Sequence, residues 1–260
     1  MSPVAESRVG LADVRRFEAA GFRAWPATSV RYDGTWVLRL TAGHPAKRLN
    51  SVNLLDPDDL QNMEERIEKA ERRFEAYGRP MTFRISPLAG EALSRHLDSC
   101  GWSRFSESVV MSLDLQKLDF ADVMDQIPMK DLGRFIAGAV EVRANDPAIK
   151  PGLSEIITAI RAEPGLFVYE RDGNAVATAI CVHDGDLAGL FEIATHENER
   201  RKGYGHSIVQ SALKWARLRG AKTAWLQVEL DNLPALNGYR KLGFREAYRY
   251  HYRRPSESGK

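Results

Sequence analysis

The sequence predicts a mixed α/β protein of the α+β kind, made of two similar halves that each fold as a mostly antiparallel sheet flanked by helices. Its 260 residues suffice for two domains of ordinary size. Residues 81–102 read as a strand, a helix and then Cys-Gly-Trp. Residues 224–244 repeat this order as a strand, a helix and then Leu-Gly-Phe. In the second half, apolar spacing predicts helix, helix, three antiparallel strands, helix, strand, helix and strands. The similarity between the halves is short, so both duplication and coincidence stay open.

Composition and charge narrow the class of protein. With 43% hydrophobic and 28% charged residues, the chain has the composition of a globular protein. It has no apolar run long enough to span a bilayer and no apolar leader at its N-terminus, so we expect a cytoplasmic protein without a membrane partner. Its two cysteines, Cys100 and Cys181, have the spacing of neither a disulfide framework nor a metal site. The net charge of +2 argues against a nucleic-acid partner, although the mildly basic second half suits a small polyanion.

Apolar periodicity, helix caps and turn residues predict the elements of the first half. We expect a first helix over residues 11–20, stopped by Gly21, and a second one capped by Asp56, with Pro57 at its first position and Gly78 after its end. A third helix is expected after Ser86, up to residue 101. Strands are expected at residues 35–41, 48–52, 81–85, 102–105 and 108–115.

The second half should start after a boundary within residues 118–128. Its helices are expected at residues 132–142, 153–162, 203–219 and 232–242. Its strands are expected at residues 166–170, 175–182, 187–195 and 222–230, followed by a final strand pair within residues 244–253.

The segment Arg-Arg-Lys-Gly-Tyr-Gly at residues 200–205 carries the clearest chemical signal. It lies between a predicted strand and an amphipathic helix. Its two glycines allow a sharp turn that leaves backbone N–H groups uncovered, and the first N–H groups of a helix have no intrahelical partner. The helix dipole and the basic side chains add positive potential there, so the segment suits a pyrophosphate. An ordinary loop before a surface helix is the alternative interpretation.

A second motif follows at residues 229–244, Glu-Leu-Asp-Asn-Leu-Pro-Ala-Leu-Asn-Gly-Tyr-Arg-Lys-Leu-Gly-Phe. Together with the glycine loop, it resembles the GNAT (Gcn5-related N-acetyltransferase) superfamily of CoA-dependent acyltransferases, whose pattern is Asn-x-x-Ala-x-x-x-Tyr-x-x-x-Gly-Phe. The resemblance covers roughly residues 126–254. The first half resembles a degenerate GNAT-like domain of the tandem bacterial type through Trp25-Pro26, Arg39-Leu40 and the segment at residues 48–52. We therefore expect domains at residues 1–122 and 123–260, of which the second is catalytic.

The resemblance implies that acetyl-CoA is the donor and a primary amine is the acceptor. Backbone N–H groups of the loop would hold the pyrophosphate, and the strand before it would bind the pantetheine arm and polarise the thioester carbonyl. The implied donor-binding residues are Ile193, Ala194, Thr195, Arg200, Arg201, Lys202, Gly203, Tyr204, Gly205, His206, Asn232, Ala235 and Tyr239. Asn232 also suits a helix cap.

Amine attack on a thioester requires a proton acceptor for the amine and a proton donor for the departing thiolate. The resemblance gives the donor role to Tyr239. Glu192, in an apolar strand, and Glu229, on the next strand, are candidate bases, and an ordered water is the third option. Some relatives have an acidic residue at the position of Gln227, which is an amide here.

Four questions stay open at the level of sequence. The first half has no glycine loop and has Leu97 where the tyrosine would stand, so we expect it to wall the acceptor cleft without binding CoA. The acceptor is a small molecule, a peptide or a protein, and the chain is a monomer or a homodimer. A CoA-binding regulatory module without turnover and a transferase of longer acyl or aminoacyl groups are the competing functions. His183, His196 and His206 are not spaced as metal ligands, so no metal is expected.

Overall fold

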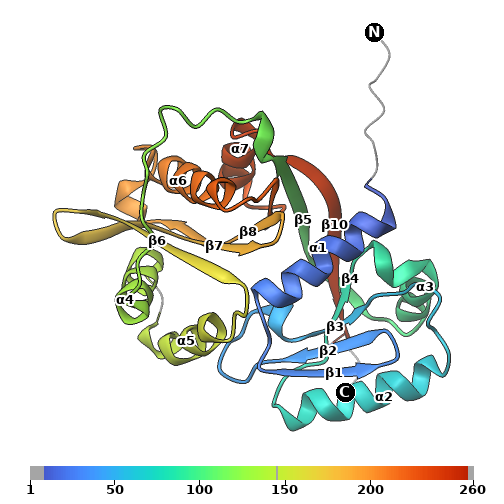
Figure 1. Cartoon of the computed structure of the whole chain (residues 1–260). Coiled ribbons are helices and arrows are strands. Elements are labelled where there is room, and N and C mark those ends of the chain that lie inside the picture. Colours follow the sequence, from blue (N-terminus) through green and yellow to red (C-terminus); the bar gives the residue numbers. More distant parts are fainter. Residues whose placement is uncertain (1–8, 145, 257–260) are drawn as a thin grey trace.

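The computed structural model describes residues 9–144 and 146–256, and residues 1–8, where we expect no leader, lie outside the described part. One mixed ten-stranded sheet runs through both halves in the order β1-β2-β3-β4-β10-β5-β9-β8-β7-β6 (Figure 1). The strands are β1 Ser29–Asp33, β2 Trp36–Leu40, β3 Ser51–Leu54, β4 Phe83–Ile85, β5 Ser103–Asp114, β6 Glu163–Arg171, β7 Asn174–Asp184, β8 Leu187–Thr195, β9 Thr223–Glu229 and β10 Arg245–Arg254. The helices are α1 Leu11–Ala24, α2 Met63–Ala76, α3 Gly90–Ser99, α4 Leu132–Arg143, α5 Lys150–Thr158, α6 Tyr204–Leu218 and α7 Leu233–Lys241. The predicted mixed α/β class is confirmed.

The two halves exchange strands at the centre of the sheet. β5, the last strand of the first half, pairs with β9, with Ser108 opposite Glu229. β10, the last strand of the second half, lies between β5 and β4. The halves therefore share one sheet, and the division between residues 122 and 123 stays a prediction.

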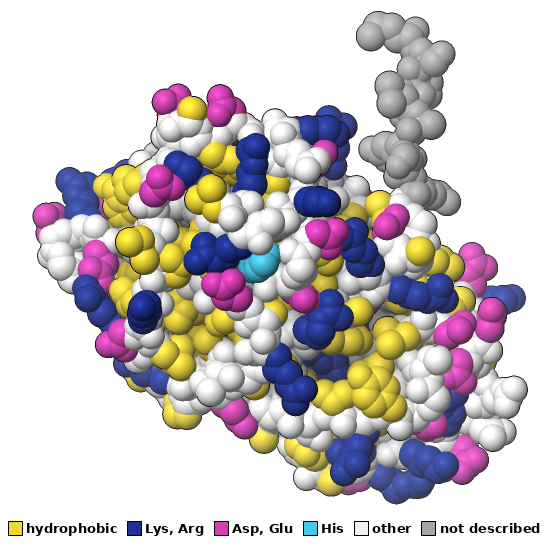
Figure 2. All heavy atoms as spheres, in the orientation of Figure 1, with side chains coloured by type: hydrophobic (Ala, Val, Ile, Leu, Met, Phe, Trp, Pro, Cys, Tyr) yellow, Lys and Arg dark blue, Asp and Glu magenta, His cyan; other side chains and the backbone are white. Residues whose placement is uncertain are grey.

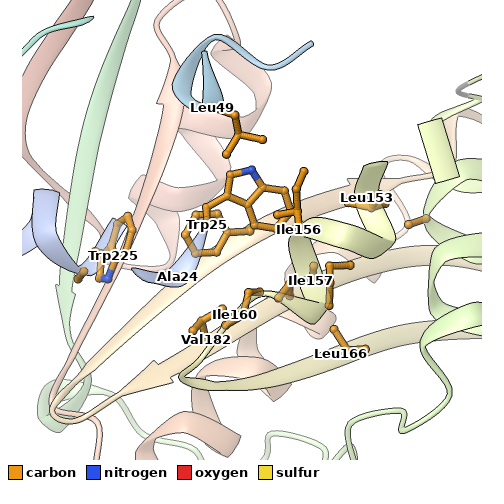
Figure 3. Packing of buried hydrophobic residues seen from close by; sticks show 14 of the residues in the cluster. Ala24, Trp25, Leu49, Leu153, Ile156, Ile157, Ile160, Leu166, Val182 and Trp225 are labelled. Carbon is orange, nitrogen blue, oxygen red and sulfur yellow. The ribbon is translucent and has the colours of Figure 1, made fainter. Parts of the chain in front are cut away.

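A shared hydrophobic core joins the halves on one face of the sheet. Trp25, at the end of α1, is 1% exposed and stacks on Phe191 of β8, with ring centroids 5.2 Å apart. Ile156 and Ile157 of α5 belong to the same cluster (Figure 3). The first half thus supplies part of the core beneath β7 and β8.

On the surface, acidic and basic side chains are interspersed over the face seen in Figure 2.

A buried ionic network also crosses the junction. The carboxylate of Glu18 on α1 pairs with the guanidinium of Arg84 on β4 and accepts a 2.6 Å hydrogen bond from the hydroxyl of Tyr248 on β10. The guanidinium of Arg84 also lies 3.6 Å from the centroid of the Tyr250 ring. Glu18 and Arg84 are each about 3% exposed. Two charges removed from water this completely are stable only as partners, so the network fixes α1 against both β4 and β10.

Several predicted boundaries were wrong. Gly21 does not stop α1, which continues to Ala24. A Cβ on Gly21 would lie 3.4 Å from the Trp225 ring, so this glycine serves close packing. Asp56 does not cap α2, which begins seven residues later at Met63; the Asp56 carboxylate instead accepts a hydrogen bond from the N–H of Asp58.

The structure also corrects three elements at the edges of the predicted domains. α5 spans residues 150–158 instead of 153–162 because Pro151 and Gly152 lie in its first turn. Residues 103–114 form one strand, β5, whose irregular point is Ser106 with φ 47°. The predicted final strand pair is the single strand β10, which shifts register twice against β5. In the described part of the chain, no helix has both the length and the apolar character that crossing a membrane requires.

Candidate functional site

The candidate site begins where two neighbouring parallel strands separate. β8 and β9 pair from Leu187 opposite Thr223 to Leu190 opposite Leu226. Beyond these pairs the strands part, and a cleft of about 800 Å³ lies beside the end of β8. Its wall is built from α4, β8, the loop before α6, the start of α6, and α7. A cleft between separated strand ends leaves backbone groups of β8 accessible to a ligand.

A β-bulge in β8 lies at this point of separation. Thr178 of β7 pairs with Ala194 and Ile180 pairs with Phe191, so two residues of β8 oppose one residue of β7. Glu192 occupies the bulge with φ 49°, a conformation that is uncommon outside glycine. Bulges interrupt the hydrogen-bond ladder and redirect neighbouring groups, which suits a strand that must turn its backbone toward a ligand.

Arg143, at the end of α4, holds this bulge in place. Its Nη2 donates a 3.3 Å hydrogen bond to the carbonyl of Ile193, and its Nε lies 3.1 Å from a carboxylate oxygen of Glu192. The Glu192 side chain is 15% exposed. Glu192 is therefore ion-paired with a residue of the cleft wall. The sequence analysis missed this pair because 49 residues separate the two in the chain. The only sequence signal for Arg143 was that it is a basic residue at the end of a predicted helix.

The glycine loop leads into α6 at the mouth of the cleft. Gly203 precedes the helix with φ 89°, and Arg201 also has a positive φ of 63°. A Cβ on Gly205 would lie 2.7 Å from Oγ1 of Thr195, so only glycine lets α6 approach the end of β8 this closely. At this end of the helix, the N–H of Ser207 donates a 3.0 Å hydrogen bond to the carbonyl of Gly203. The first N–H groups of a helix have no intrahelical partners, and Tyr204, Gly205 and His206 at the start of α6 line the cleft.

The structure brings almost all the predicted donor-binding residues to this one cleft. Lys202 is the exception, because its ammonium pairs with Glu199 at 3.0 Å. The side chain of Asn232 accepts a 3.2 Å hydrogen bond from the N–H of Ala235, which makes it the cap of α7. The predicted donor-binding residues that line the cleft are Ile193, Ala194, Thr195, Arg200, Arg201, Gly203, Tyr204, Gly205, His206, Asn232, Ala235 and Tyr239.

Tyr239 reaches the cleft from α7. Its ring packs against Phe244, with centroids 5.9 Å apart. Burial raises the pKa of the Tyr239 hydroxyl to about 12, and the positive charge of Arg143 opposes part of that rise. The hydroxyl therefore stays protonated at neutral pH and is available as a proton donor.

Glu229 lies in a different pocket from Tyr239. This second pocket, of about 430 Å³, lies between the segment 44–48 of the first half and the strands β9, β5 and β10. The Glu229 carboxylate is 2.8 Å from Nζ of Lys47. Gln227, also in its wall, accepts a 2.9 Å hydrogen bond from the hydroxyl of Tyr250. Sequence reasoning did not find Lys47, because its partner lies 182 residues away.

Comparison with known proteins shows what the chain resembles in sequence and in fold. The profile of a family described as "Probable histone acetyltransferase Rv0428c C-terminal" matches residues 11–253. An uncharacterized N-acetyltransferase of Bacillus subtilis, YobR, is 27% identical over 250 residues, which cover 93% of this chain and 98% of that protein. A GCN5-related N-acetyltransferase from Kribbella flavida superposes with a TM-score of 0.69 at 19% identity, covering 95% of this chain and 96% of that one. A tandem GNAT protein from the clavulanic acid biosynthesis pathway superposes with a TM-score of 0.63 at 16% identity, covering 99% of this chain and 91% of that one. The two structural likenesses show a shared fold.

Proposed function

Because the chain belongs to the GNAT superfamily, in the family described as "Probable histone acetyltransferase Rv0428c C-terminal", and is an acyl-CoA N-acyltransferase, we propose that it transfers the acetyl group of acetyl-CoA to a primary amine by direct attack. The observation that carries this proposal is the convergence of three features on one cleft. These are the glycine loop at the start of α6, the bulge at Glu192 and the hydroxyl of Tyr239.

The donor would lie along the cleft from the helix start to the bulge. The free N–H groups at the start of α6, between Arg201 and His206, would bind the pyrophosphate, and the helix dipole favours that negative charge. Backbone groups of Ile193 and Thr195 would hold the pantetheine arm. An N–H group at the bulge would stabilise the negative oxygen that forms when the amine attacks the thioester carbon.

We propose Tyr239 as the proton donor to the thiolate of CoA. When the tetrahedral intermediate collapses, the carbon–sulfur bond breaks and the sulfur leaves with the electron pair. Desolvation, which raises the pKa of the Tyr239 hydroxyl, also raises the proton affinity of a thiolate in the same cleft. The proton transfer therefore remains feasible although the tyrosine is a weak acid.

The amine must lose a proton before or during its attack. Glu192 is paired with Arg143 and Glu229 with Lys47, so each carboxylate already has a basic side chain as its partner in the folded chain. We therefore favour removal of the amine proton through ordered water. The first half would form one wall of the acceptor pocket, because the segment 44–48 lines it.

A direct transfer assay tests this function. The protein is incubated with acetyl-CoA labelled in the acetyl group and with a panel of amines, and labelled N-acetyl products are measured by mass spectrometry. We expect transfer to at least one amine, with Glu192→Gln and Glu229→Gln each lowering kcat/KM by less than about 10-fold, since neither removes the proton donor. A loss greater than about 100-fold in one of these variants would instead identify that carboxylate as the base.

A further inference from the structure

The second pocket approaches the bulge of β8 from the first half of the chain. Arg48 and Gln227 line this pocket and also a small cavity of about 10 Å³ whose wall includes Phe191. Phe191 directly precedes the bulge at Glu192. A molecule in the 430 Å³ pocket could therefore direct one end toward the proposed position of the thioester while the rest stays between the two halves.

Of the three basic side chains at residues 44–48, one has a charge without an acidic partner. The ammonium of Lys47 is paired with Glu229 at 2.8 Å and bonded to the hydroxyl of Ser106 at 2.6 Å. Burial lowers the pKa of His44 below its usual value, although Glu192 opposes the change, so this imidazole is neutral at neutral pH. Within the described residues, no carboxylate lies within salt-bridge distance of Arg48.

Two aromatic rings fix the position of the Arg48 guanidinium. It lies 5.8 Å from the centroid of the Trp25 ring and 5.7 Å from that of Phe191. Cation–π contacts of this kind orient a guanidinium and leave the N–H groups at its edge available to other partners. Arg48 is therefore a pre-positioned donor of two parallel hydrogen bonds, the geometry that a carboxylate accepts.

The interior behind Arg48 also carries an excess of positive charge. Arg39 and Arg84 line the same small cavity as Arg48, and among the described residues Glu18 is the one acidic residue in its wall. Glu18 is already bonded to Arg84 and Tyr248, and Arg84 keeps two buried nitrogens, Nε and Nη2, without partners in the described part of the chain. Burial and the positive charge of Arg84 lower the pKa of Arg39 to about 9, which reflects the same excess. An anion in the pocket would lower the electrostatic free energy of these buried, positively charged guanidinium groups.

We propose that the acceptor is a primary amine that also carries a carboxylate, as amino acids do, and that Arg48 binds this carboxylate in the pocket between the two halves. This inference rests on the proposed function and specifies the substrate class of its acceptor side. The small cavity has room for no more than about one water molecule, so the carboxylate would lie on the pocket side of Arg48. The amine would then face the bulge of β8.

Matched pairs of amines test the proposal. Each pair is an α-amino acid and its carboxamide, which have the same amine and side chain but differ in charge. We expect the native protein to have a KM about 10- to 100-fold lower for the acid, the usual effect of a hydrogen-bonded charge pair. In Arg48→Met, the KM values for the acid and its carboxamide should become about equal. Arg48→Lys should keep part of the preference for the acid. Arg95→Met, the same substitution at an exposed arginine of α3, should leave the preference unchanged.

Direct binding separates failure of this inference from failure of the proposed function. Calorimetry measures the affinity of native protein and of Arg48→Met for acetyl-CoA and, independently, for N-acetyl amino acids. Suppose that acetyl-CoA binds, but that the protein acetylates carboxamides, or amines with a phosphate group, equally as well as the α-amino acids. The carboxylate site is then overturned and the transferase function stands. If acetyl-CoA does not bind, the proposed function fails. Binding of N-acetyl amino acids that Arg48→Met does not weaken overturns the carboxylate site in either case.

Discussion

Replacing Tyr239 with phenylalanine is expected to lower kcat by about 100-fold or more and to leave the KM for acetyl-CoA close to its native value. The substitution removes only the hydroxyl, whose proton is needed when the thiolate leaves, and general acids typically contribute a factor of about 100 to 10,000. The ring that packs against Phe244 remains, so the cleft keeps its shape. Steady-state kinetics with the best amine of the panel measure both constants.

The pH profile gives a second test of the same role. Tyr239 must be protonated to act, and its raised pKa of about 12 keeps it protonated through about pH 10. The native rate should therefore not fall between about pH 7 and pH 10 through loss of this proton. Tyr169→Phe on β6 is the matched control and should keep the native kcat. A Tyr239→Phe variant with native kcat, or a native rate that declines around pH 10 only when Tyr239 is present, would contradict the assignment.

Removing Glu18 is expected to destabilise the fold by about 3–5 kcal/mol, the usual cost of leaving one charge of a buried pair uncompensated. In Glu18→Ala, the guanidinium of Arg84 on β4 would stay buried without its counter-ion. The network joins both halves, so we expect their unfolding to be affected together. The midpoint of urea unfolding, followed by circular dichroism, measures the change.

Two further variants check the origin of this loss. The double variant with Glu18→Leu and Arg84→Met should be more stable than Glu18→Ala, because it removes both charges and keeps apolar volume. Glu65→Gln, in the exposed pair with Lys69 on α2, should leave the midpoint unchanged. Equal effects of Glu18→Ala and Glu65→Gln would show that the buried pair contributes no more than a surface pair.

Local patterns closely predicted the elements around the cleft that we propose for the donor. The strand at residues 187–195 was predicted at both ends, and α6 lies within one residue of its predicted bounds. In these segments the signals are local, because a glycine turn, an apolar helix face and a capping residue such as Asn232 act within a few residues of the chain. The loop and Tyr239 lie at one cleft, and their contacts with CoA stay a prediction.

Features that depend on distant parts of the chain were not predictable in this way. The exchange of β5 and β10 is set by pairing partners, and alternation along each strand fits either partner. Asp56 has the residue type of a cap, yet its side chain bonds to the turn at Asp58 instead. Similarly, the ion pairs of Glu192 with Arg143 and of Glu229 with Lys47 join residues that are far apart in the sequence. Only the folded chain shows such partners.

Calorimetric titration of acetyl-CoA into the native protein and into a variant with Gly203→Glu and Gly205→Glu tests the central claim most directly. The variant adds two negative charges and side chains at the helix start, one in a conformation with φ 89° and one within 2.7 Å of Thr195. Gly185→Glu, at an open glycine with φ 64° in the turn before β8, controls for charge and backbone strain. We predict that the native protein and the control bind acetyl-CoA at a single site and that the double variant, still folded, does not. Equal binding by all three proteins would contradict the donor site at the start of α6.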